Sequence, residues 1–220
     1  FYFYPIYSPS SFSVDMEIYN AEGKKLAVVP NALHITSPAS EFEVIDASFH
    51  ANNLGLAGTF PLNARLIAKA DSGTQLPARI KLALDIGSSA GRLPCNICTN
   101  LQPYNPAWET KKHSFKWDPI LIGSENPEVW IMNSSPKIND DAYASMDFVY
   151  YRESDTKTLK RSYRLPAFGG MVVRPHEDPE LQAFFEDKIG WLTVVSSNPY
   201  TTTYYFSRPY HGVVGGDHGF

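Results

Sequence analysis

The sequence predicts a mainly β protein: an antiparallel β-sandwich of the jelly-roll type, with one short helix near residues 178–189. Three observations lead to this class. Thirteen Phe, thirteen Tyr and four Trp among 220 residues are side chains that suit a pleated sheet. Seventeen prolines interrupt the chain throughout, which disfavours long helices. Several segments alternate apolar and polar residues with a period of two, the pattern of a strand with one buried face.

The clearest alternation in the N-terminal half is a strand at residues 12–19, where every second residue from Phe12 to Ile18 is apolar. The tetrad Asn20-Ala-Glu-Gly23 after it predicts a turn, because Asn and Gly accept turn conformations. Further strands in this half are predicted at 26–29 and 41–50, and the alternating segments 62–69 and 79–86 predict a hairpin.

The C-terminal half predicts strands and one helix. Asp178 can cap the helix, Pro179 suits its first position, and Gly190 is expected to close it. Leu181 and Phe185 fall on one face of that helix. Strands are predicted at 114–117, 120–122 and 129–133, at 146–152 paired with 159–165, and at 191–196 paired with 200–207 around the Asn198-Pro199 turn.

The domain organisation predicted from these elements is a single β-sandwich over 11–207. An extended aromatic arm at 1–10 precedes it, because prolines break that segment, and a flexible Gly/His tail at 208–220 follows it. Residues 87–111 hold Gly, Ser, Pro and Asn without periodicity, and a connection of that length is typical of a functional loop or an assembly contact.

Composition excludes several classes of protein. Hydrophobic residues make up 43% and charged residues 19%, which is incompatible with a disordered chain. The net charge of −4 offers no overall basic footprint for nucleic acid, and no apolar run is long enough for a membrane span. The chain begins with Phe1 rather than Met, which leaves polyprotein cleavage, signal removal and trimming as open explanations.

No set of catalytic residues is recognisable, and no cofactor is expected. Cys95 and Cys98 form a CxxC pair, but a redox role requires a helix that starts at the first cysteine, and Gly, Ser and Pro surround this pair. Two loop thiols or a local disulfide is the simpler interpretation. His211, Asp217 and His218 in the tail are weak candidates for a metal site, against the simpler interpretation of a solvated tail.

Carboxylate pairs offer a second kind of candidate chemistry. Asp15 and Glu17 share one face of a predicted strand, and so do Glu41 and Glu43. Two carboxylates serve glycoside hydrolysis when they face each other across a cleft, whereas neighbours along one strand usually mark its solvated face.

The aromatic residues outside the predicted strands are the strongest candidates for function, because exposed aromatic clusters mark interfaces or sugar-stacking surfaces. Other aromatics gather near the C-terminal strand, from Tyr200 to Phe206. The residues expected to make assembly contacts are Phe1, Tyr2, Phe3, Tyr4, Tyr7, Tyr104, Trp108 and Tyr210.

The C-terminal stretch resembles a known family. Trp191-Leu-Thr-Val-Val, then Ser197-Asn198-Pro199, then a Thr-rich aromatic strand into Ser207-Arg208-Pro209 is similar to the end of picorna-like icosahedral virus coat proteins, most of all the small coat subunit of comovirus type. The helix predicted at 178–189 departs from that pattern. The resemblance implies a jelly roll cut from a polyprotein, whose extended ends contact neighbouring coat subunits in a virion that encloses RNA.

Two functions from different classes follow. The first is a structural coat subunit that assembles through its arm and loops into a viral shell, with other coat subunits as partners and a host receptor or glycan as a further partner. The alternative is a secreted glycan-binding or glycan-cleaving β-sandwich, in which Tyr104, Trp108, Trp117 or Trp130 stacks on sugar rings. A metal or redox enzyme is the third and weakest hypothesis.

Overall fold

The computed structural model describes residues 1–4, 8, 10–37, 41–72, 75–77, 79–87, 95–101, 107, 114–120, 126–134, 143–153, 155–207 and 214–219. Over these residues the chain forms four antiparallel sheets and two short α-helices. The predicted mainly β class is therefore confirmed, and the jelly-roll form stays a prediction. No helix in the described ranges is long and apolar enough to cross a bilayer.

The described chain groups into two compact units. Unit 1 comprises Phe1–Asp85 and Asn96–Tyr104, and unit 2 comprises Ile86–Cys95 and Asn105–Phe220. Unit 1 contains two sheets, with strand orders β4-β1-β6-β7 and β3-β2-β5. Its elements are β1 (Tyr2–Phe3), β2 (Phe12–Tyr19), β3 (Lys25–Ile35), β4 (Glu43–Val44), α1 (Ala47–Asn53), β5 (Asn63–Ala70), β6 (Ile80–Ile86) and β7 (Cys95–Leu101). The last residue of β6 and the first of β7, Ile86 and Cys95, belong to unit 2.

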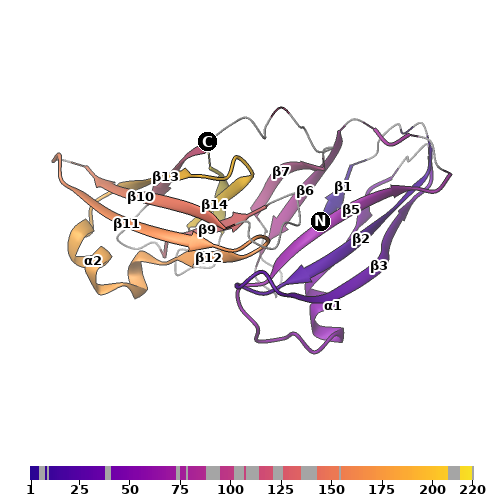
Figure 1. The fold of residues 1–220 in the computed structure, drawn as a ribbon, viewed down its shortest axis with the longest axis horizontal. Coiled ribbons are helices and arrows are strands. Elements are labelled where there is room, and N and C mark those ends of the chain that lie inside the picture. Colours follow the sequence, from indigo (N-terminus) through magenta and orange to yellow (C-terminus); the bar gives the residue numbers. More distant parts are fainter. Residues whose placement is uncertain are drawn as a thin grey trace. The chain divides into compact units, whose positions relative to one another are not determined.

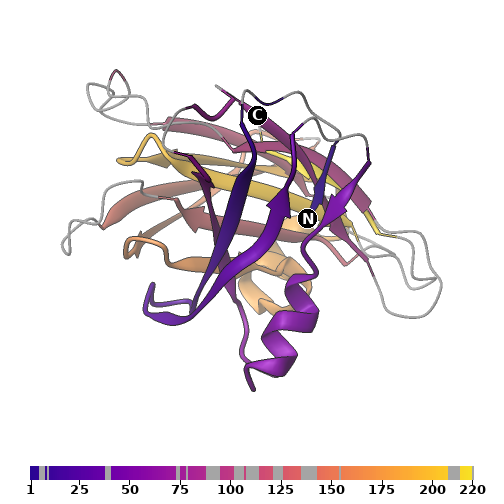
Figure 2. The ribbon, with the colours of Figure 1, turned by 90° about the vertical axis from the view of Figure 1, so that its right-hand side faces the viewer.

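The core of unit 1 lies between its two sheets. Phe12, Val14 and Met16 of β2 are fully buried and pack in one cluster with Phe3 of β1 and Leu82 of β6. The strand predicted at 12–19 is thus confirmed, and so is the turn after it, in which Gly23 adopts φ +74° and donates to the Asn20 carbonyl at 3.0 Å. Figure 2 shows β2 and β3 side by side, with α1 at one end of the unit.

Two predictions in unit 1 are wrong in their connectivity. The segments at 62–69 and 79–86 are strands, but β5 pairs with β2, and β6 pairs with β1. Alternation specifies which face of a strand is buried, but it does not specify which strand is the partner. The prediction that these two neighbouring segments pair with each other is therefore wrong.

The strand predicted at 41–50 is mostly not strand, and its last four residues begin helix α1. Only the two residues of β4 are strand, and Asp46 then caps α1 by accepting from the Phe49 backbone N–H at 2.9 Å. Helix α1 contains no buried residue, so it gives no apolar periodicity for a sequence pattern to detect.

Unit 2 is built from two four-stranded sheets, with strand orders β11-β10-β13-β8 and β12-β9-β14-β15 (Figure 1). Its elements are β8 (Ser114–Ile120), β9 (Glu128–Asn133), β10 (Ala144–Arg152), β11 (Thr158–Leu165), β12 (Gly170–Val173), a 3₁₀ turn (Pro175–Glu177), α2 (Pro179–Phe185), β13 (Gly190–Ser196), β14 (Thr201–Ser207) and β15 (Gly215–His218).

One core joins the two sheets of unit 2, as in a β-sandwich. Phe148 of β10 and Val194 of β13 come from the first sheet, Ile131 of β9 comes from the second, and all three are fully buried in one cluster. The predicted hairpin of 146–152 with 159–165 is confirmed as the β10–β11 pair. The strand predicted at 129–133 is confirmed as β9.

The predicted pairing around Asn198 is wrong, although both strands exist. Strand β13 lies in the first sheet and β14 in the second, so the turn carries the chain from one sheet to the other. The Asn198 side chain holds this corner by accepting from the Tyr200 backbone N–H at 2.9 Å and donating to Asn133. Asn133 is fully buried and also donates to the Leu165 carbonyl at 3.0 Å. The sequence Asn133-Ser-Ser formally fits a glycosylation sequon, but its asparagine lies in the interior.

Helix α2 confirms the predicted helix over a shorter range. Asp178 caps it as expected, accepting from the backbone N–H groups of Glu180 and Leu181 at 3.0 and 3.1 Å. The helix ends at Glu186, which adopts a left-handed φ of +50°. Gly190, expected to close the helix, is instead the first residue of β13; its role is to allow close packing beneath Phe185.

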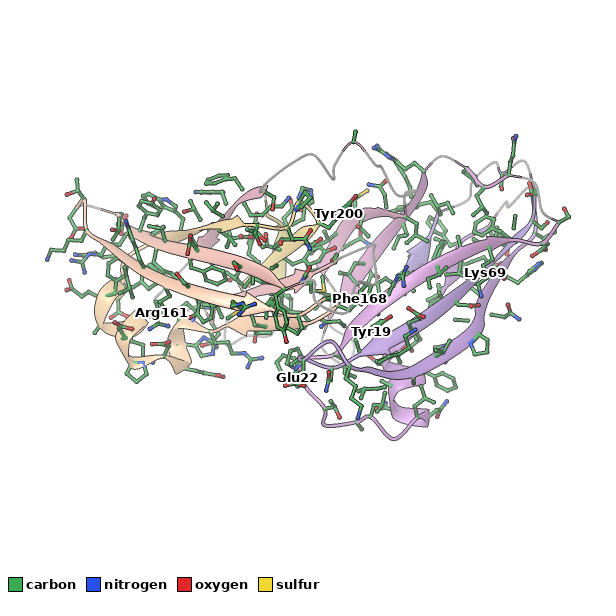
Figure 3. All side chains as sticks on the ribbon, viewed as in Figure 1. Tyr19, Glu22, Lys69, Arg161, Phe168 and Tyr200 are labelled. Carbon is green, nitrogen blue, oxygen red and sulfur yellow. The ribbon has the colours of Figure 1, made fainter. Side chains whose placement is uncertain are left out.

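Asp178 also accepts from the Arg161 guanidinium, which comes from β11 (Figure 3). This contact, with the two backbone N–H groups, holds the pKa of Asp178 below its ordinary value. We expect Asp178→Ala to lower the free energy of unfolding by about 1 kcal/mol, the usual cost of a lost cap. Urea denaturation of Asp178→Ser distinguishes the contribution of the cap from that of the ion pair, because serine can cap the helix but cannot pair with Arg161. A serine variant as unstable as the alanine variant would show that the cap contributes nothing.

Candidate functional site

The predicted contact residues at the N-terminus do not form a free arm in the described ranges. The Phe1 ammonium donates to the Ile45 carbonyl at 2.7 Å, and Phe3 is 1% exposed in the core of unit 1. Strand β1 pairs with β4 on one side and β6 on the other, and Phe3 packs in the same core cluster as the buried residues of β2. Tyr2 is 39% exposed, and the Tyr4 ring meets Phe42 edge-on at 5.5 Å. Tyr7, Tyr104, Trp108 and Tyr210 lie outside the described residues.

The two cysteines are not brought together. Cys95 and Cys98 are three residues apart on β7, so their side chains leave opposite faces of the strand. Neither thiol is part of a disulfide; Cys95 is buried and donates to the Gly216 carbonyl at 3.3 Å, whereas Cys98 is exposed. A local disulfide is therefore wrong for this structure.

The tail candidates for a metal site are placed in part. His211 lies outside the described residues. Asp217 and His218 belong to β15, which pairs with β14, so this part of the predicted flexible tail is strand. Their side chains are about half exposed, and the His218 Nε2 lies 3.9 Å from the Asp217 Oδ1. Within the described ranges, no three His, Cys, Asp or Glu side chains gather in a way that could hold a metal ion.

The carboxylates of β2 are held by cations from neighbouring strands. Glu17 accepts from Tyr19, Lys25 and Arg65. Burial raises the pKa of Glu17, but the hydrogen bonds from Lys25 and Tyr19 and the two positive charges outweigh it, so the pKa is lowered. Asp15 accepts from Lys69, which chiefly lowers its pKa. These acids thus stabilise the sheet and are not the solvated face the sequence predicted.

The outer face of the sheet β11-β10-β13-β8 carries a group of apolar side chains, which we call the aromatic face. It consists of Phe115 and Trp117 of β8, Trp191 and Val195 of β13, and Tyr151 of β10. Cross-strand register aligns them in rows: Phe115 lies opposite Val195, and Trp191 lies opposite Tyr151. The Tyr151 and Trp191 rings stack with centroids 5.4 Å apart and planes within 7°.

The aromatic face is exposed although its side chains are large. Phe115 is 56%, Trp117 is 38% and Val195 is 37% exposed. Strand β8 is the edge of its sheet, and its outward residues are the apolar ones, while Lys116 and Asp118 alternate with them. Trp117 is a predicted sugar-stacking residue, but the aromatic face itself has no signal in the sequence, because aromatics that alternate with charged residues normally point inward.

The inward residue of β8 is an unusual acid. Asp118 is 0% exposed, and within the described ranges no group donates a hydrogen bond to either carboxylate oxygen. The Thr203 hydroxyl of β14 lies beside this carboxyl and is one of the groups that lower its pKa. A Cβ on Gly219 would overlap that hydroxyl and lie 2.6 Å from the Asp118 Oδ1. Only glycine therefore fits beside the pair.

Burial raises the pKa of Asp118 to about 6. The nearby Thr203 hydroxyl and the positive charges of Lys116 and His218 oppose this shift but do not cancel it. The carboxyl is accordingly neutral in mild acid and carries a buried charge at neutral pH. A perturbed buried acid of this kind is a candidate functional group, and no sequence motif marks it.

Trp130 is also a predicted sugar-stacking residue, and its side chain makes contacts within the second sheet of unit 2. Its indole N–H donates to Glu128 at 2.9 Å, and its ring meets Phe206 edge-on at 5.5 Å. Glu128 in turn accepts from Arg174 at 3.0 Å. Trp130 is therefore part of a packed network on the second sheet and does not belong to the aromatic face.

The residues described above give two features with functional potential: the aromatic face and the buried Asp118. The chain matches no protein-family model, no curated protein and no solved structure.

Proposed function

We propose that this chain is a non-catalytic structural subunit that assembles with other protein subunits through its aromatic face. The form of assembly that the C-terminal resemblance implies is the shell of a virion, with the chain as a coat subunit around RNA. The observation that carries the proposal is the exposure of Phe115 and Trp117 on the edge strand β8 together with Val195, which lies opposite Phe115 on the neighbouring strand β13.

The composition of this area supports a protein contact. Aromatic side chains are enriched at the centre of interfaces, and charged ones are depleted there. Thr193 lies between Val195 and Trp191 on β13, opposite Trp117, and the exposed Asp147 of β10 lies opposite Val195 at the other side of the area. Burying it against a partner contributes about 25 cal/mol per Å² of apolar surface before association costs are subtracted.

Unit 1 has its own exposed apolar residues. Phe49 of α1 is 57% exposed, and Phe42, Leu54 and Phe60 are between 44% and 58% exposed. Because α1 buries none of its residues within the chain, its apolar side chains are available to a neighbouring molecule. A subunit of a closed shell contacts several neighbours, and more than one apolar area suits that role.

The contact surface proposed here differs from the one expected from sequence. The sequence predicts that an extended arm at residues 1–10 contacts neighbouring subunits, but Phe3 is in the core of its own unit. Assembly through the aromatic face does not require the arm. We therefore assign the main contact to β8 and β13.

Glycan binding is the second candidate, and the stacked rings favour it. Trp191 lies flat against Tyr151, and Trp117 is exposed on the same sheet face. Flat aromatic surfaces stack on sugar rings. This function requires that a single copy of the chain bind polysaccharide, and it does not require the chain to self-associate.

Sedimentation of the purified chain over a wide concentration range tests both functions. We expect wild-type protein to associate and the double variant Phe115→Ser/Trp117→Ser to stay monomeric, with at least about a tenfold weaker association, as for loss of interface anchors. Ile189→Ser is the matched control, since Ile189 is 51% exposed and lies outside the face. It should associate as wild type does.

Two outcomes contradict the assembly proposal. The first is a wild-type chain that remains monomeric at every concentration, alone and with sister subunits. The second is a double variant that associates as well as Ile189→Ser. A monomeric chain that binds insoluble polysaccharide, and loses this binding in Trp117→Ala, would instead establish the glycan-binding alternative.

A further inference from the structure

The last described strand, β15, is weakly anchored. It has four residues, two of them glycines, and it pairs with β14 on one side. Two further contacts fix its backbone: Cys95 donates to the Gly216 carbonyl at 3.3 Å, and the Gly219 N–H donates to the Thr203 carbonyl at 2.9 Å. Short edge elements with few buried side chains open at low free-energy cost.

The strand covers the buried acid of β8. Gly219 follows β15 directly, and the space above its Cα is occupied by the Thr203 hydroxyl and the Asp118 carboxylate. With the strand in place, Asp118 is fully buried and its oxygens have no hydrogen-bond donor in the described ranges. A neutral carboxyl can instead donate its own proton to a neighbouring oxygen, which a charged one cannot.

We propose that β15 is a pH-dependent latch, which stays docked on β14 while the Asp118 carboxyl is neutral and opens when that carboxyl is ionised. Ionisation places an unpaired charge in the interior, and the least costly way to hydrate it is to lift the weakest neighbouring element. This device is independent of the proposed assembly function.

The charged and titratable groups around Asp118 set the direction of the response. The positive charges of Lys116 on the same strand and His218 on β15 favour the ionised form of Asp118. Tyr205 on β14 is also close, and the negative charges of Asp118 and Asp217 raise its pKa. Since burial raises the pKa of Asp118 to about 6, the latch is closed in mild acid and loosens at neutral pH.

Amide hydrogen exchange of the full chain between about pH 5 and about pH 8 tests the latch, after correction for intrinsic exchange rates. Because the pKa of Asp118 is about 6 with the strand docked and about 4 when the carboxyl is hydrated, opening of β15 should increase about tenfold between these two pH values. Amides of β15 should follow this increase in wild type, while those of β10 and β13 stay protected. In Asp118→Asn, β15 should be equally protected at every pH.

Asp217→Asn is the control, because it removes an acid from the same strand without touching the buried carboxyl. It should keep the wild-type pH response. Protection of β15 that does not change with pH in wild type, or a response that persists in Asp118→Asn, overturns the latch. Carbon-13 NMR titration of the wild-type carboxyl gives a check that requires no variant: a midpoint near the ordinary value for Asp, about 4, would also overturn it.

Discussion

Replacing Gly190 by alanine should destabilise unit 2 by about 3 kcal/mol or more, at the upper end of overpacking effects. A Cβ at this position would overlap the Phe185 ring and lie 2.6 Å from the Tyr151 carbonyl oxygen. Phe185 is 0% exposed and packs edge-on against Tyr150, and the carbonyl is backbone of the neighbouring strand. Neither can move without separating β10 from β13 or lifting α2 from the core.

Urea denaturation followed by tryptophan fluorescence measures this effect, because all four tryptophans fall in the residue range of unit 2. Gly215→Ala is the matched control, since nothing lies within 4 Å of a Cβ added there. The midpoint of Gly215→Ala should stay close to that of wild type. Equal midpoints for Gly190→Ala and Gly215→Ala would show that α2 does not pack on Gly190 as described.

Asp118→Asn should stabilise unit 2 at neutral pH by up to about 3 kcal/mol, the equivalent of a pKa shift of about two units. The folded-state pKa of about 6 lies above the unfolded value, so the folded chain binds this proton more tightly. Wild-type stability therefore falls as pH rises from about 4 to about 6 and levels off above that. The asparagine variant stays neutral and avoids this loss, and opening of β15 would limit the difference.

The measurement is the free energy of unfolding of both proteins across the same pH range. The two curves should converge below about pH 4, where both side chains are neutral, and separate as pH rises. Glu17→Gln gives the opposite sign, because the pKa of Glu17 is lowered and its charge stabilises the fold. An Asp118→Asn curve that runs parallel to wild type, or below it at neutral pH, would contradict a buried unpaired carboxylate.

Period-two alternation predicted the strands well where the inward residues are apolar. Strand β2 is the clearest case, since Phe12 to Ile18 alternate and every apolar member is buried. The same reasoning missed the functional surface, because β8 is inverted: Phe115 and Trp117 point outward, and Asp118 points inward. The alternation is identical in both cases, and only the opposing sheet decides which side faces the core.

Sequence patterns predicted caps and turns correctly where the interactions involve only neighbouring residues. The Asp178 cap and the turn at Asn20 each depend on a few neighbouring residues, so sequence contained them. Pairing across the sheets depends on residues far apart in the chain. For this reason the sequence pattern predicts the wrong partner for β6, and it predicts a free arm where β1 lies between β4 and β6.

Hydroxyl-radical footprinting of the chain in its assembled and unassembled states tests most directly whether the aromatic face is the contact surface. Mass spectrometry then reports the oxidation of Phe115, Trp117 and Trp191 separately from that of Phe42 and Phe49. We predict that the first three lose reactivity on assembly by more than any other described aromatic residue. Assembly that protects Phe42 and Phe49 while leaving Phe115 and Trp117 fully reactive would contradict the account.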